Sequence, residues 1–159
     1  MDYLLYTLLC GIGATAVMDV WGIMRCIAAP DYGLVGRWLA NMTRGQFRHK
    51  SITAAPVVRG ERLIGWIAHY LIGIVFAGML IGFEGLAWIQ QPTIGPALIV
   101  GIGTVAAPFL LMQPGMGAGL ASSLTPRPGY ARFQSLITHA VFGFGLYLSA
   151  WVAYFLYTI

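Results

Sequence analysis

The sequence has very little charge. Only 9 % of its 159 residues are Asp, Glu, Lys or Arg, and five of these residues are acidic, whereas a soluble domain carries about 25 % charged residues. Hydrophobic residues make up 58 % of the chain, and the mean hydropathy is +0.77. These values exclude a disordered chain, a collagen-like chain and an ordinary soluble enzyme, and they indicate a membrane protein.

Several functional signatures are also missing. Two cysteines, Cys10 and Cys26, are too few for a disulfide framework. The net charge is +4, but nine basic residues are too few for a surface that follows nucleic-acid phosphates, so we expect no nucleic-acid partner. The chain contains no Gly-x-Ser-x-Gly elbow and no His-Glu-x-x-His motif, which argues against two common classes of hydrolase.

Four long apolar stretches dominate the chain. A membrane-spanning helix needs about 20 mostly apolar residues, and four stretches meet this requirement: Tyr3–Met24, Leu63–Phe83, Ile94–Met112 and Leu136–Tyr157. Each must be helical, because lipid cannot satisfy an exposed backbone. We therefore predict an all-α polytopic membrane protein, a bundle of four transmembrane helices that forms a single domain over residues 1–159.

The basic residues set the orientation that we expect. All nine lie after the first span or between the third and fourth spans, at Arg25, Arg37, Arg44, Arg48, Lys50, Arg59, Arg62, Arg127 and Arg132. Positively charged connections remain in the cytoplasm. The sequence therefore predicts an inner-membrane protein with cytoplasmic basic connections and with both termini outside, in the periplasm.

The long connection after the first span predicts a short amphipathic helix. Its apolar residues recur at helical spacing, at Leu34, Val35, Trp38, Leu39 and Met42. Arg37, Asn41 and Arg44 fall on the other side, and Asp31 is a candidate N-cap. We expect this helix to lie in the membrane interface, where its basic residues meet anionic lipid headgroups.

The four spans show signs of an internal repeat. Gly11-Ile12-Gly13 in the first span matches Gly101-Ile102-Gly103 in the third, and His-x-x-x-Gly occurs in both the second and fourth spans. Two hairpins of the same orientation would form a parallel repeat. Chance similarity between apolar helices explains the same pattern, so both interpretations stay open.

Ionisable residues inside a span are costly and are the default functional hypothesis. Asp19, His69 and His139 are expected at comparable depth, in the cytoplasmic half of the bundle. The third span brings Gln113 to the same level, and Glu61 lies at the mouth. We take these five residues as the candidate ligand-binding site.

Three chemistries fit this layer. Asp19, His69 and His139 match the ligands of a metal ion such as zinc or iron. Two histidines on different helices also match axial haem ligands, the weaker of the two cofactor hypotheses. The third is a hydrogen-bonded network that relays protons or only clasps the helices together.

The segment from Met112 to Gly129 differs from the rest of the chain. It alternates glycines at 115, 117 and 119 and contains three prolines. Irregular backbone at membrane depth must be covered by protein or line a water-filled cavity. A broken helix that lines a small cavity and an ordinary turn at the inner surface both fit.

Several strings together resemble a known family. They are Gly36-Arg37-Trp38, Gly60-Glu61, Gly65-Trp66-Ile67-Ala68-His69-Tyr70, Met112-Gln113-Pro114 and Thr125-Pro126. They resemble the small bacterial inner-membrane family catalogued as domain of unknown function 2938, over essentially the whole chain. The resemblance implies a bacterial four-helix membrane protein and implies no catalytic residues.

The sequence therefore predicts a small inner-membrane protein that binds or passes a small ligand or ion through its cytoplasmic half. One alternative is a membrane enzyme or redox protein with a histidine-bound metal or haem. Another is a structural or accessory subunit whose polar residues are only interhelical clasps. Because four helices make a thin wall for a pore, we expect a homodimer or larger assembly.

Overall fold

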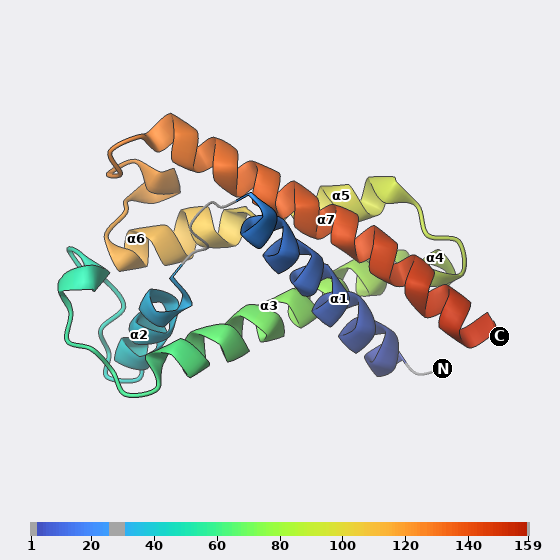
Figure 1. The fold of residues 1–159 in the computed structure, drawn as a ribbon, viewed down its shortest axis with the longest axis horizontal. Helices are drawn as coiled ribbons and strands as arrows, with labels where there is room; N and C mark the ends of the chain where they lie inside the picture. Colours follow the sequence, from blue (N-terminus) through green and yellow to red (C-terminus); the bar gives the residue numbers. More distant parts are fainter. Residues whose placement is uncertain (1–2, 26–30, 159) are drawn as a thin grey trace. The chain divides into compact units, whose positions relative to one another are not determined.

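The computed structural model describes residues 3–25 and 31–158 (Figure 1). Cys26 lies outside the described residues. Every regular element in the described part is helical, which confirms the predicted fold class. The elements are α1 (Tyr3–Met24), α2 (Tyr32–Met42), η1 (Ile52–Ala54), α3 (Glu61–Glu84), α4 (Ala87–Gln90), α5 (Ile94–Gly103), η2 (Pro108–Met112), α6 (Gln113–Met116), η3 (Leu120–Ser122) and α7 (Pro128–Thr158).

Four helical segments are long and apolar enough to cross a membrane. They are Tyr3–Met24, Glu61–Glu84, Ile94–Met116 and Pro128–Leu156. All four predicted spans are therefore found, and the second, third and fourth extend beyond their predicted limits. By length and composition the chain is an integral membrane protein.

The third of these segments is not a continuous α-helix. The α-helix α5 ends at Gly103, and η2 is a π-helix that begins at Pro108. A proline ring inside a helix removes one backbone donor and clashes with the carbonyl group four residues earlier. The wider π turn accommodates this defect, and such turns are frequent at functional sites.

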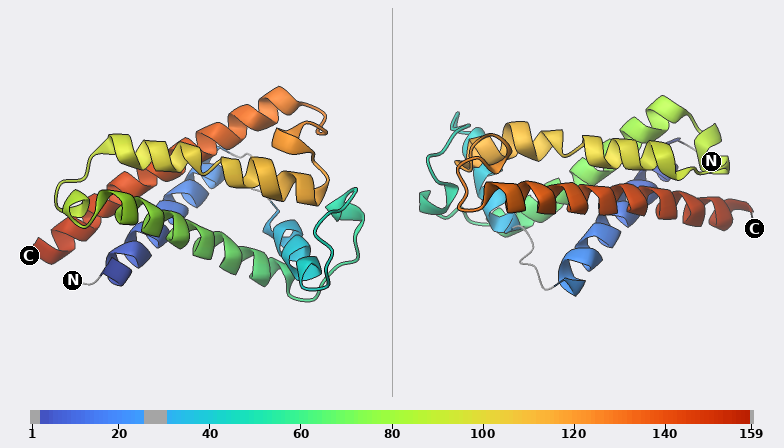
Figure 2. Two further views of the ribbon diagram at one scale, coloured as in Figure 1. Left: turned by 180° about the vertical axis from the view of Figure 1, so that it is seen from behind. Right: turned by 90° about the horizontal axis from the view of Figure 1, so that it is seen from above.

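The chain divides into two compact units. Unit 1 comprises residues 1–29, 70–104 and 137–159, and unit 2 comprises residues 30–69 and 105–136. Unit 1 holds the main apolar core, which includes Leu80, Ile89, Phe142 and Leu146. The beginning of α1, the end of α3, the beginning of α5 and the end of α7 lie at one end of this unit (Figures 1 and 2).

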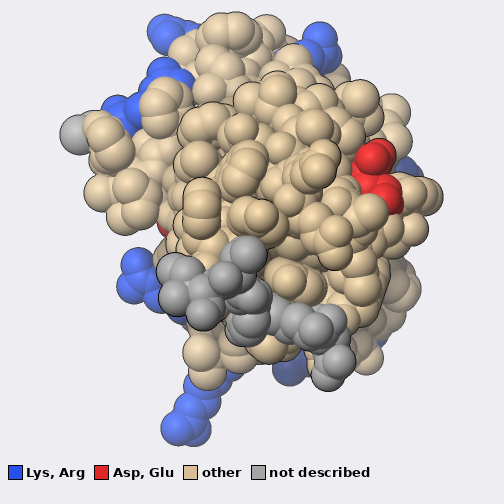
Figure 3. Space-filling view, turned by 90° about the vertical axis from the view of Figure 1, so that its right-hand side faces the viewer, with Lys and Arg blue, Asp and Glu red and all other residues tan. Residues whose placement is uncertain are grey.

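That end of unit 1 is poor in charge. No Lys or Arg occurs in the Glu84–Thr93 connection, in the first turn of α1 or in the last turn of α7. Viewed from this side, the surface is mostly neither basic nor acidic and carries an acidic patch (Figure 3). This distribution agrees with the charge asymmetry from which we predicted the orientation.

Glycines bring the helices of unit 1 into close contact. A Cβ atom on Gly11 of α1 would collide with the α3 backbone at Ile74, and one on Gly101 of α5 would collide with the α7 backbone at Gly143. Gly11 and Gly101 are the matching glycines of the two candidate repeats. They make corresponding contacts, α1 with α3 and α5 with α7, and this correspondence favours a true repeat.

Unit 2 packs α2 against the beginning of α3. A Cβ atom on Gly36 would collide with the carbonyl oxygen of Glu61, and one on Gly65 would collide with the carbonyl oxygen of Tyr32. The N-terminus of α2 is capped as predicted, because the backbone N–H of Gly33 donates to Asp31 Oδ1 at 2.9 Å. This confirms the helix and its cap.

The predicted polar face of α2 is wrong for two residues. Arg37 is 8 % exposed and Asn41 is 6 % exposed. We expected both to lie on the polar side of an interfacial helix. Arg37 is buried because Glu61 of α3 and the segment before α3 supply its hydrogen-bond partners, whereas Asn41 donates to the carbonyl oxygen of Arg37 on its own helix. Arg44, on the same side, is exposed as expected.

Candidate functional site

In unit 1, Asp19 joins two helices. The hydroxyl group of Tyr70, on α3, donates a hydrogen bond to Asp19 Oδ2, on α1, at 3.0 Å. One helical turn away, Gly73 lies against the side chain of Thr15, so the two helices are held close together. The packing places the Asp19 carboxylate opposite the Tyr70 hydroxyl group, which can donate a hydrogen bond to it or exchange a proton with it.

His139 has a similar partner within the same unit. Its Nδ1 atom lies 3.0 Å from the hydroxyl oxygen of Thr104, which also donates to the carbonyl oxygen of Gly101 at 2.6 Å. Since the threonine proton is used in that second bond, Nδ1 is the donor to Thr104. Nδ1 therefore carries a proton in this arrangement.

The two pairs lie near the glycine contacts of their helices but not at matching positions of the candidate repeat, where His139 corresponds to His69 and not to Tyr70. Asp19 and Tyr70 lie one turn beyond the contact between Thr15 and Gly73. Thr104 and His139 lie one turn beyond the contact between Gly101 and Gly143. Unit 1 therefore places an ionisable group with a hydroxyl partner on each of its two helix pairs.

His69 belongs to unit 2. Its Nε2 atom lies 2.9 Å from the hydroxyl oxygen of Tyr32, and the two ring centroids are 4.4 Å apart. Trp66 completes the cluster, with its ring centroid 4.4 Å from that of Tyr32. A hydrogen bond and ring packing hold His69, on α3, against Tyr32 of α2.

Glu61 forms a two-pronged ion pair with Arg37. Arg37 Nη2 donates to Glu61 Oε1 at 2.7 Å, and Arg37 Nε donates to Oε2 at 2.8 Å. Arg37 Nη1 also donates to the carbonyl oxygen of Ala55 at 3.0 Å. The bonds to Glu61 raise the pKa of Arg37 above its usual value, so the guanidinium stays charged.

Gln113 is the first residue of α6 and directly follows η2. Its buried Oε1 atom has no hydrogen-bond partner among the described residues, and the same is true of His49 Nε2. Leaving such atoms unsatisfied is costly. Gln113 and His49 are both in unit 2, and the His49 backbone N–H donates to the carbonyl oxygen of Gly115 at 2.8 Å.

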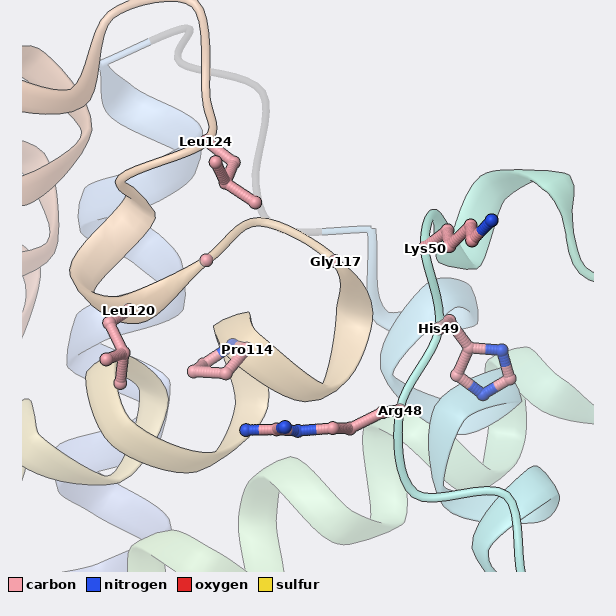
Figure 4. Close-up of a pocket in the computed structure, with 8 residues that line it drawn as sticks. Arg48, His49, Lys50, Pro114, Gly117, Leu120 and Leu124 are labelled. Carbon is pink, nitrogen blue, oxygen red and sulfur yellow. The ribbon is translucent and has the colours of Figure 1, made fainter.

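The glycine-rich segment after Gln113 forms an irregular loop beside residues 48–50. Gly117 has a φ of 95°, and a Cβ atom there would also collide with the carbonyl oxygen of Lys50. A pocket of about 400 Å³ lies here. In Figure 4, Arg48 reaches towards Pro114, while His49 and Lys50 lie on the other side of their stretch.

The candidate ligands do not gather into a metal-binding cluster inside either unit. Among the described residues, no group of three or more His, Cys, Asp or Glu side chains is placed to hold a metal ion. Asp19 and His139 belong to unit 1, whereas His69, Glu61 and Gln113 belong to unit 2. The metal site formed by Asp19, His69 and His139 stays a prediction.

Sequence reasoning missed the partners of these residues. It did not single out Tyr32, Tyr70 or Thr104, and it placed Arg37 on the wrong face. The only available signal was a hydroxyl group in an apolar helix, and several other Ser, Thr and Tyr residues of the chain carry the same signal. The partner of each group is 24 or more residues away in the chain, so local spacing carries no information about it.

The fold and these polar pairs define an all-helical membrane protein with four spanning helices and ionisable groups inside them. The chain belongs to the DUF2938 family of proteins of unknown function, whose model matches residues 8–153. This confirms the resemblance inferred from the sequence strings. No curated protein and no solved structure matches the chain.

Proposed function

We propose that the protein binds and passes a small ion, in the first instance the proton, through a polar site in the cytoplasmic half of its helices. The observation that carries this proposal is the hydrogen bond between Asp19 and Tyr70 inside the spanning helices of unit 1. An ionisable residue at such a position is expensive and marks ion pathways. Thr104 and His139 add a second such pair to this unit.

The proposal includes a location and an orientation. The protein lies in a bacterial inner membrane, with both termini in the periplasm and the basic connections in the cytoplasm. Anionic lipids surround the exposed basic residues, and copies of the chain assemble as a homodimer or larger assembly. The distribution of Lys and Arg along the chain supports the orientation.

Proton passage is tested in sealed vesicles that contain the purified protein. A potassium gradient with valinomycin drives protons inward, and an internal pH dye records their entry. We expect Asp19→Asn to slow proton entry by about tenfold or more, because the amide cannot exchange a proton and positioned acids and bases contribute at least that much to proton transfer.

The matched control is Glu84→Gln. Glu84 is an exposed acid at the last residue of α3, so this variant also removes one carboxylate from the same unit. It should conduct like the unmodified protein. Proton entry no faster than in empty vesicles, or equal rates in Asp19→Asn and Glu84→Gln, would overturn the proposal.

A structural role is the second candidate, because the same bonds link α1 to α3 and pair α7 with Thr104. A clasp predicts that Asp19→Asn lowers the melting temperature and leaves proton entry unchanged. Measuring melting and flux on the same samples separates the two functions.

The cofactor hypotheses are tested on the same purified protein. Elemental analysis tests whether Asp19, His69 and His139 bind a metal. A stoichiometric metal that is lost in both His69→Ala and His139→Ala would establish this metal site. A Soret absorption band would identify haem.

A further inference from the structure

A second pocket in unit 2, of about 490 Å³, lies between the end of α2 and the segment that leads into α3. Asn41, Arg44 and Gln46 line it from one side, and Arg59 and the stretch 56–58 line it from the other. We call it the arginine pocket. It is separate from the polar pairs of unit 1.

Two cations in this pocket have no anionic partner. Arg44 and Arg59 are exposed, and no ion pair or side-chain hydrogen bond joins either guanidinium group to another of the residues described. They come from different segments, 15 positions apart in the sequence. Two like charges at one pocket repel each other, and a bound anion would relieve that repulsion.

The ion pair of Arg37 and Glu61 holds the walls of the arginine pocket in place. Arg37 donates to the carbonyl oxygens of Ile52 and Ala55, and its partner Glu61 accepts from the backbone N–H of Val58. This ion pair therefore fixes the stretch 52–58 against α2. On the α2 side, Asn41 is anchored by donating to the carbonyl oxygen of Arg37 at 2.9 Å.

We propose that the arginine pocket binds a phosphate-type oxyanion. Arginine forks match phosphate oxygens in shape and charge, and the amide group of Gln46 adds donor capacity at the same pocket. The ion pair of Arg37 and Glu61 positions the pocket and does not touch the ligand. The pocket lies in the connection between the first and second spans, at the membrane surface. Its anion is therefore either the phosphate of a lipid headgroup or a soluble phosphate.

The test is isothermal titration of the full-length protein, purified in a neutral detergent and phosphate-free buffer. The two probes are inorganic phosphate and the short-chain anionic lipid dihexanoyl-phosphatidylglycerol. We expect at least one probe to bind and each of Arg44→Gln and Arg59→Gln to weaken it about tenfold or more, since a charge-assisted hydrogen bond is lost in each variant.

The matched control is Arg48→Gln, which removes one exposed basic charge from the same unit but outside the arginine pocket. It should bind the probe as tightly as the unmodified protein. Binding of inorganic phosphate assigns a soluble ligand, and binding of the lipid alone assigns a headgroup. Either result supports the site.

Two outcomes would overturn the proposal. The first is that neither probe binds at concentrations up to about 1 mM. The second is an equal loss in Arg48→Gln, which means that net charge alone attracts the anion. If a glutamine variant fails to fold, Arg44→Lys and Arg59→Lys replace it: they keep the charge, lose the fork and should still weaken binding.

Discussion

At the scale of residues, the buried Arg37 of unit 2 is paired with the half-buried Glu61. Arg37 and Glu61 are linked by two hydrogen bonds, and Arg37 also satisfies two backbone carbonyl groups of the neighbouring segment. Removing one member of a buried pair costs more than removing an exposed charge, because the remaining ion has lost both water and partner. The pair thus fixes the connection between α2 and α3.

We therefore expect Arg37→Gln to lower the melting temperature clearly, because the glutamine leaves Glu61 without its counter-charge. A thermal melt followed by circular dichroism measures the effect. Arg48→Gln, which removes an exposed basic residue, should melt like the unmodified protein. If Arg37→Gln and Arg48→Gln melt alike, the ion pair does not stabilise unit 2.

At the scale of elements, glycines determine which helices approach each other. Gly101 and Gly103 lie two positions apart in the same Gly-Ile-Gly motif, yet only Gly101 touches the backbone of α7. A Cβ atom on Gly103 would meet nothing within 4 Å. The motif was visible in the sequence, but its two glycines were indistinguishable there because the facing helix was unknown.

This difference predicts opposite outcomes for two single alanine variants. Gly101→Ala should lower the free energy of unfolding by about 1–3 kcal/mol, because the methyl group collides with backbone that cannot shift freely. Gly103→Ala should be neutral or slightly stabilising, since alanine favours helix. Denaturation in mixed detergent measures both. Equal stability of the two variants would contradict the contact between α5 and α7.

At the scale of the whole molecule, the charge distribution is strongly one-sided. All nine basic residues lie in or beside the connections that follow the first and third spans. The start of α1, the Glu84–Thr93 connection and the end of α7 carry none. The basic residues from which we predicted the orientation include Arg44 and Arg59 of the arginine pocket.

The orientation is tested by cysteine labelling in intact cells. With Cys10 and Cys26 replaced by alanine, Arg44→Cys should react only with a membrane-permeant reagent if the connection after the first span is cytoplasmic, as we propose. Glu84→Cys should react with an impermeant reagent from outside. The reverse pattern would show that the predicted topology is inverted.

The sequence by itself determined the class of protein, the four spans, the helix capped by Asp31 and the family. These features depend on local composition and on residue spacing within a few helical turns, both of which can be read from the sequence. The tertiary structure decided which groups meet: Asp19 with Tyr70, His139 with Thr104, and Arg37 with Glu61. Those contacts join segments 24 to 51 residues apart. They arise from helix packing at glycines, where the shape of the opposing backbone decides the partner and no local pattern specifies it.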